Sequence, residues 1–137
     1  MNKEKIVSDV NKQIIIEYCS KIREYLRLDE WEADIVFYDF GKEDILAEIC
    51  ILESYLHCTI RVNEELTAKI IKENETEKLI DGLIHEFIHI IIDPLYRLAI
   101  DAQNNSTMPF LEEKREQAVC RVTGIILKEF KEPLVFI

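Results

Sequence analysis

Apolar residues recur at nearly every fourth position over residues 2–28, which predicts a first helix with one apolar side. Residues 34–40 are mostly β-branched or aromatic and end at a glycine, a pattern typical of a strand followed by a turn. Two further apolar and partly alternating runs, 45–52 and 56–62, predict two more strands with a turn at 53–55. The first half of the chain is therefore expected to form a helix and a small sheet.

The second half of the chain shows helical patterns interrupted by proline. Asn63 is placed to cap a short helix, and an acidic first turn then opens a longer helix over 76–92. Proline disfavours helical geometry in the residue before it and removes a backbone donor. The helix is therefore expected either to kink at Asp93-Pro94 or to restart there, with Asp93 as its cap, and to continue to about Ala102.

The end of the chain completes an α+β pattern. A polar loop at 103–109 ends in a proline, apolar spacing predicts a final helix over 110–130, and the apolar tail 132–137 is expected to dock on the rest of the protein. The 137 residues, 48% hydrophobic and 32% charged, suffice for one core and predict a single domain, 1–137. The expected fold has an N-terminal helix, a sheet of three to four strands, a buried central helix and a C-terminal helix.

The charge of the chain narrows the range of partners. The formal net charge is −10, which argues against binding to nucleic acid phosphates or to an anionic membrane. Mixed charges at the N-terminus and short apolar runs predict neither a signal peptide nor a transmembrane segment, so a cytoplasmic location is expected. The cysteines form no C-x-x-C pair, and without an export signal they are expected to be reduced and mostly buried: Cys19, Cys50, Cys58 and Cys120.

The central helix contains His85-Glu86-Phe87-Ile88-His89, which has the form H-E-x-x-H. On a helix the two histidines lie one turn apart on the same side, where both imidazoles can reach one cation. Glu86 is placed to take a proton from a water on the open side of that cation. The surrounding residues are apolar, and burying three polar side chains among them is costly unless something pairs with them. The motif therefore predicts a metal site.

A catalytic metal site of this kind needs a third protein ligand besides the two histidines. Asp93 continues their spacing, but three successive turns of a helix span about 11 Å, which is too far for one ion. The last helix offers Glu112, Glu113 and Glu116. Glu112 and Glu116 lie near the edge of its apolar side, whereas Glu113 points further towards solvent. Either of the first two could bind the metal while the other orients a ligating histidine.

The motif followed by a glutamate on a later helix resembles the gluzincin metallopeptidases. The chain is most similar to the small, single-domain members found in bacteria, phages and mobile elements, which are a minimal zincin-like core. The run from Glu116 to Val122 resembles the E-Q-x-V-x-x-L stretch of the last helix in that group. The resemblance covers about residues 31–130 and implies one Zn²⁺ held by His85, His89 and Glu116, with Glu112 and then Glu113 as alternatives to the glutamate.

The resemblance also implies a reaction, the hydrolysis of a polypeptide substrate. Zinc would polarise the scissile carbonyl and lower the pKa of its water, while Glu86 takes the proton and delivers it to the leaving amine. In zincins an edge strand before the motif helix pairs with extended substrate, and here this strand is expected at 58–62. Candidate donors to the developing oxyanion, or substrate contacts, are His57, Tyr55, Tyr96 and Arg97.

Two other interpretations compete with the peptidase. A zincin fold of weak or lost activity could serve as a binding or regulatory module with a bound metal, although a structural site has no use for a general base such as Glu86. A helical interaction protein with a chance motif is less favoured, because the buried motif would be hard to stabilise without a metal. His57, alone on a strand, is more typical of a structural histidine than of a ligand.

Overall fold

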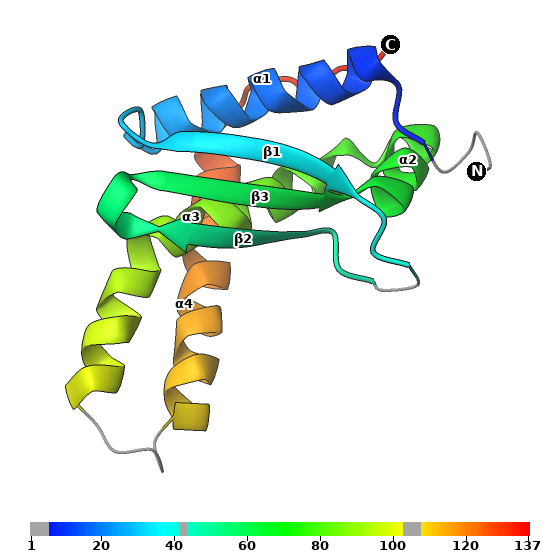
Figure 1. Cartoon of the computed structure of the whole chain (residues 1–137). Helices are drawn as coiled ribbons and strands as arrows, with labels where there is room; N and C mark the ends of the chain where they lie inside the picture. Colours follow the sequence, from blue (N-terminus) through cyan, green and yellow to red (C-terminus); the bar gives the residue numbers. More distant parts are fainter. Residues whose placement is uncertain (1–5, 42–43, 103–107) are drawn as a thin grey trace.

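The computed structural model describes residues 6–41, 44–102 and 108–137. These residues form an α+β fold with four α-helices and a three-stranded mixed sheet (Figure 1). One short 3₁₀ turn, η2, joins two of the strands. The elements in chain order are α1 (Asp9–Tyr25), β1 (Glu32–Tyr38), β2 (Ala47–Leu52), η2 (Glu53–Tyr55), β3 (His57–Asn63), α2 (Glu64–Glu73), α3 (Thr76–Ala102) and α4 (Met108–Glu129).

The sheet has the order β1-β3-β2, with β1 parallel and β2 antiparallel to β3. Alternate residues of each strand face the helices, as the period of two in a strand requires. On the central strand, Cys58, Ile60 and Val62 are fully buried. The prediction that 58–62 forms an edge strand is therefore wrong, because β3 is paired on both sides and the edges are β1 and β2. Local alternation identifies a strand but not its neighbours, which explains the error.

The helix ends follow local capping chemistry. The Ser8 side chain accepts a hydrogen bond from the Asn11 backbone N–H, so α1 begins at Asp9 rather than near residue 2. Residues 2–5 of the predicted helix lie outside the described residues, while Ile6 and Val7 precede the helix. The predicted cap of α2 is confirmed, since the Asn63 side chain accepts from the Leu66 N–H at 3.2 Å.

Helix α3 continues through Pro94 to Ala102 without a restart. The prediction of Asp93 as a helix cap is therefore wrong, because Asp93 lies in the helix interior. The N-terminal half of α3 runs beneath the sheet, while its C-terminal half projects beyond it beside the first half of α4 (Figure 1). Of the predicted loop at 103–109, residues 103–107 lie outside the described residues, and Met108 and Pro109 already belong to α4.

The core lies between the sheet and the helices, and the N-terminal half of α3 supplies its centre. Its fully buried residues include Leu83, Ile84, Phe87 and Ile88. A Cβ on Gly82 would lie 2.5 Å from the Leu46 side chain, so a glycine lets α3 approach the start of β2 closely. The motif helix is therefore held directly against the strand that forms one edge of the sheet.

The C-terminal tail docks on α1, as predicted. Leu134 is buried, the Tyr18 hydroxyl donates to the Glu132 carbonyl at 2.8 Å, and the Asn11 side chain hydrogen-bonds both backbone groups of Ile137. The cysteines are free, but only Cys19 and Cys58 of the four are buried, so the expectation of mostly buried thiols is half correct.

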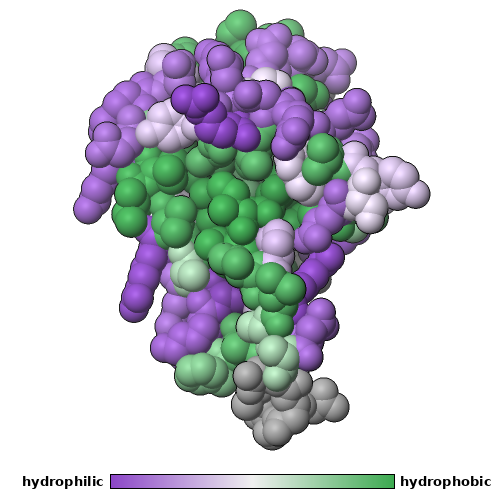
Figure 2. All heavy atoms as spheres, turned by 90° about the vertical axis from the view of Figure 1, so that its left-hand side faces the viewer, coloured by the Kyte–Doolittle hydropathy of each residue, from purple (hydrophilic) through white to green (hydrophobic). Residues whose placement is uncertain are grey.

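Apolar side chains gather on the face that looks left in Figure 1, as Figure 2 shows. The turn between β2 and β3 and the outer half of α3 lie on this side. The exposed large apolar residues of these elements are Leu52, Tyr55, Leu56, Ile91, Leu95 and Leu98. No helix among the described residues combines the length and the apolarity needed to cross a membrane.

Candidate metal centre

Helix α3 presents the two histidines of the motif at the point where it emerges from the core. The side chain of His85 is 25% exposed and that of His89 is 8% exposed. Their ring centroids lie 5.1 Å apart, as expected for residues one turn apart on one side of a helix. The apolar residues between them, Phe87 and Ile88, point into the core and fix the rotation of the helix. Both imidazoles are thereby directed towards α4.

Glu116 of α4 completes a group of three potential ligands. Its two carboxylate oxygens lie 3.4 Å from His85 Nε2 and 3.4 Å from His89 Nε2, respectively. One ligand atom from each residue lies within 4.8 Å of the others. In a tetrahedral zinc site with bonds of about 2.1 Å, neighbouring ligand atoms are about 3.4 Å apart. The two separations from Glu116 to the histidine nitrogens therefore match those that one small cation requires.

The other two glutamates proposed as ligands have different surroundings. Glu113 accepts a hydrogen bond from Gln117 at 3.2 Å on the exposed side of α4. Glu112 lies near the phenol of Tyr96, where desolvation and this carboxylate raise the pKa of Tyr96. Of the three predicted candidates, Glu116 is the one that the structure groups with the histidines.

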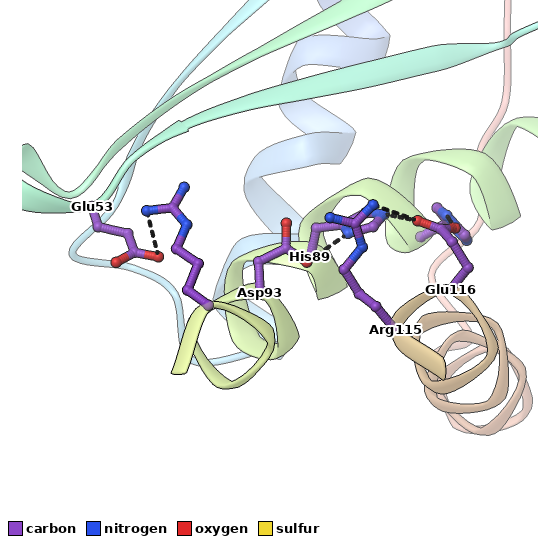
Figure 3. Close-up of polar contacts among 7 residues, drawn as sticks. Glu53, His89, Asp93, Arg115 and Glu116 are labelled. Atoms are coloured by element: carbon purple, nitrogen blue, oxygen red, sulfur yellow. Dashed lines mark hydrogen bonds and ion pairs between the residues drawn. The ribbon is translucent and has the colours of Figure 1, made fainter. Parts of the chain in front are cut away.

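Asp93 supports the site from behind. Its Oδ1 lies 2.9 Å from His89 Nδ1 (Figure 3). When Nδ1–H donates to this carboxylate, the lone pair of Nε2 is left facing Glu116, where a metal would bind. From the sequence, Asp93 was expected to cap a helix rather than to orient His89. The signal was present, because a carboxylate four residues after a ligating histidine lies on the same side of the helix.

The pKa values of the two histidines are shifted in opposite directions. Burial and the neighbouring His89 lower the pKa of His85, which favours the neutral imidazole that binds metals. Burial also lowers the pKa of His89, but the hydrogen bond and charge of Asp93 outweigh it, so the net shift is upward. In the metal-free protein the positive charge therefore resides preferentially on His89, beside two carboxylates.

Glu86 is not one of the three grouped ligands and lies beside them. Burial is the largest influence and raises the pKa of Glu86 to about 7; the charge of His89 opposes this shift, and the negative charges of Glu116, Glu48 and Asp93 add to it. A carboxyl group with a pKa near neutrality can both accept and release a proton under ordinary conditions. The environment of Glu86 therefore suits a general base.

Two of the predicted oxyanion or substrate contacts lie in other surroundings. His57 Nε2 is 2.9 Å from Asp34 Oδ2, a contact between β3 and β1 at the end of the sheet. This pairing agrees with the structural interpretation of His57. Tyr55 lies in the turn η2 and is 80% exposed.

The other two predicted contacts lie on the outer half of α3. The guanidinium of Arg97 is 3.5 Å from Glu53 in the turn η2, so it ties the helix to the sheet (Figure 3). Tyr96 contacts a cation, Arg115, that was not predicted from the sequence. The guanidinium of Arg115 stacks on the Tyr96 ring at 4.4 Å, and its Nη2 is 3.6 Å from Glu116. Only the position of Arg115 next to Glu116 in the chain could have indicated it.

The arrangement is thus a His/His/Glu group that could hold one metal ion, with a carboxylate of raised pKa beside it. Two nitrogen donors and one oxygen donor are the chemistry of a metal site that keeps a position open. No family model, no curated protein and no solved structure matches this chain, so the site rests on its own geometry.

Proposed function

We propose that this protein is a zinc-dependent peptidase built on a zincin-like core. The observation that carries the proposal is the pair of 3.4 Å separations from Glu116 to the two histidines, with Glu86 adjacent. Borderline-soft imidazole nitrogens with one carboxylate suit zinc better than Mg²⁺ or Ca²⁺, which prefer sites made entirely of oxygen. The intact Glu86 favours catalysis over a purely structural metal.

Each residue of the site has a distinct role in this proposal. His85, His89 and Glu116 would hold the ion, and Asp93 would keep His89 in the tautomer that presents Nε2. Bound zinc would supply a Lewis acid that polarises a peptide carbonyl and acidifies water. Glu86 would accept the proton of the attacking water and return it to the leaving nitrogen.

The edge strand β2 is the place where an extended substrate would lie. Its partner β3 occupies one side, and its other side is unpaired within the described part of the sheet. The close approach of Gly82 to Leu46 places β2 next to the motif helix, and Glu48 of this strand is near enough to affect Glu86. Pairing of a polypeptide with this edge would bring a backbone carbonyl towards the site.

The test is metal analysis together with cleavage of an unfolded polypeptide such as casein. We expect about one zinc per chain in the wild-type protein and in Glu86→Gln, with cleavage reduced at least a thousandfold in the variant. Glu113→Gln, an equivalent change on the exposed side of α4, is the matched control and should retain both properties. Zinc-loaded wild-type protein that leaves every tested polypeptide intact would overturn the peptidase and support a metal-holding binding module.

A further inference from the structure

We propose that Arg115 is the oxyanion-binding residue of this metal site. The inference rests on the proposed function for the identity of the reaction, and on the structure for the position of the cation. In peptide hydrolysis the water oxygen bonds to the carbonyl carbon and the C–N bond then breaks. The proton of the water passes through Glu86 to the leaving nitrogen. Between these steps the carbonyl oxygen is negatively charged and needs a donor.

The guanidinium of Arg115 reaches the group of ligands directly. Its Nη2 lies 3.6 Å from Glu116 Oε1, and the same oxygen lies 3.4 Å from His89 Nε2 (Figure 3). The side chain is 27% exposed, so its charge is partly shielded from water. Its Nε–H is buried and has no hydrogen-bond partner among the residues that the structure describes. A guanidinium carries five N–H donors, so Arg115 has donors available for an anion beside the site.

Tyr96 holds this guanidinium in place. The Arg115 Cζ lies 4.4 Å from the centre of the Tyr96 ring, within the range of a cation–π contact. Tyr96 follows His89 by seven residues, two helical turns, and therefore lies on the same side of α3. A stacked guanidinium loses less freedom on binding an anion than a mobile one, which suits a preorganised donor.

Glu86 and Arg115 reach the site from different helices: Glu86 is on α3 near His89 and Glu116, and Arg115 is on α4 beside Glu116. Glu86 precedes His89, whereas Tyr96 and the guanidinium stacked on it follow it. The base must reach the attacking water and the leaving nitrogen while the donor reaches the carbonyl oxygen, so the two groups have to be separated.

Two other cations on the outer parts of α3 and α4, Arg97 and Lys114, are engaged elsewhere. Arg97, a candidate from the sequence, pairs with Glu53 of the turn η2. Lys114, which precedes Arg115, lies over the ring of Phe110 at 5.4 Å. Of these three cations, Arg115 is the one that contacts an oxygen of the proposed ligand Glu116. This contact distinguishes Arg115 from Arg97 and Lys114, whose contacts are with other residues.

The test measures the affinity of zinc-loaded protein for inorganic phosphate, a tetrahedral oxyanion, by isothermal titration calorimetry. We expect Arg115→Gln to weaken phosphate binding about tenfold or more, because one charge-assisted pair is lost. Arg115→Lys should recover part of the affinity. Arg121→Gln removes the same charge from an exposed position of α4 and should remain within about twofold of the wild type.

Zinc content, measured for every variant, separates two roles of Arg115. If Arg115→Gln keeps its zinc and binds phosphate as tightly as the wild type, the proposal is overturned. If the variant loses zinc while Arg121→Gln retains it, Arg115 positions Glu116 instead, and the proposal is also overturned. Retained zinc with weakened phosphate binding supports it.

The oxyanion proposal and the peptidase proposal can be overturned independently of each other. Zinc-loaded protein that cleaves no polypeptide, but whose phosphate affinity depends on Arg115, would contradict the peptidase and retain the oxyanion site. If cleavage is lost in Glu86→Gln but Arg115→Gln keeps its full kcat, the peptidase proposal is supported and the oxyanion proposal is overturned. If both proposals hold, Arg115→Gln should lower kcat about a hundredfold with little change in KM.

Discussion

The two halves of helix α3 have opposite environments, although one continuous helix forms both. In the first half, Leu83, Phe87 and Ile88 are fully buried beneath the sheet. In the second half, Leu95 and Leu98 are 64% and 67% exposed. The candidate metal centre lies at the boundary, with the motif on the buried half and Asp93 and Tyr96 on the outer half.

The difference shows how a site of this kind is supported. Tight packing fixes the rotation of the inner half, and with it the direction of both imidazoles. The outer half has few apolar contacts to lose, so polar groups can be placed there at low cost. Substitutions on the two halves of α3 and around the metal centre can test this contrast.

The first prediction concerns packing. Phe87→Ala removes a ring that is completely buried and should lower the free energy of unfolding by about 3–5 kcal/mol. Leu95→Ala, on the outer half, should cost less than about 1 kcal/mol because the side chain is 64% exposed. Urea unfolding of both variants measures the difference. Equal costs at the two positions would contradict the division of the helix into two environments.

The second prediction concerns the effect of Glu86 on the stability of the metal-free protein. The folded pKa of about 7 lies above the ordinary value of 4.5, so folding favours the protonated acid. The stability of the metal-free wild type should therefore fall as pH rises from 5 to 8, and Glu86→Gln should be more stable than the wild type at pH 8. The gain should be about 3 kcal/mol at pH 8 and should fall below about 1 kcal/mol at pH 5.

Urea unfolding in the presence of a chelator, at both pH values, measures this gain. Glu113→Gln on the exposed side of α4 is the control and should show no comparable gain. A Glu86→Gln variant no more stable than wild type at pH 8 would show that the carboxylate is not destabilised by its surroundings.

The third prediction concerns the support that the outer half gives to the metal. Asp93→Asn keeps the shape but removes the charge that faces His89 Nδ1, and should weaken zinc binding about 10- to 100-fold. Asp101→Asn, an exposed position of the same helix, should leave the affinity within about twofold. Competition with a chromogenic chelator measures both values. If Asp93→Asn binds zinc as tightly as the wild type, Asp93 does not contribute to zinc affinity and only the three ligands do.

The fourth prediction concerns the proline inside α3. Pro94 lacks the N–H that would bond to the carbonyl four residues earlier, so Pro94→Ala should stabilise the protein by about 1 kcal/mol. Pro109→Ala, in the first turn of α4 where that N–H has no helical partner, should change the stability by less. Thermal unfolding compares the two. A destabilised Pro94→Ala variant would mean that the proline contributes to packing at the boundary.

Local features of the chain could be predicted well from its sequence. The spacing of His85 and His89 places both imidazoles on one side of a helix, and the apolar residues around them indicate its burial. The cap at Asn63 and the general location of each strand follow from the same short-range chemistry. The choice of Glu116 depended on a resemblance, and the geometry of α4 against α3 agrees with it.

Long-range features were decided by the tertiary structure alone. A strand pattern does not specify its neighbours, so the central position of β3 and the free edge of β2 could not be read from residues 58–62. The continuation of α3 through Pro94 depends on packing that local propensity does not include. Asp93 and Arg115 acquire their roles from contacts with His89 and with groups on a neighbouring helix. The sequence thus determined which residues could bind a metal, whereas packing determined which charges surround them.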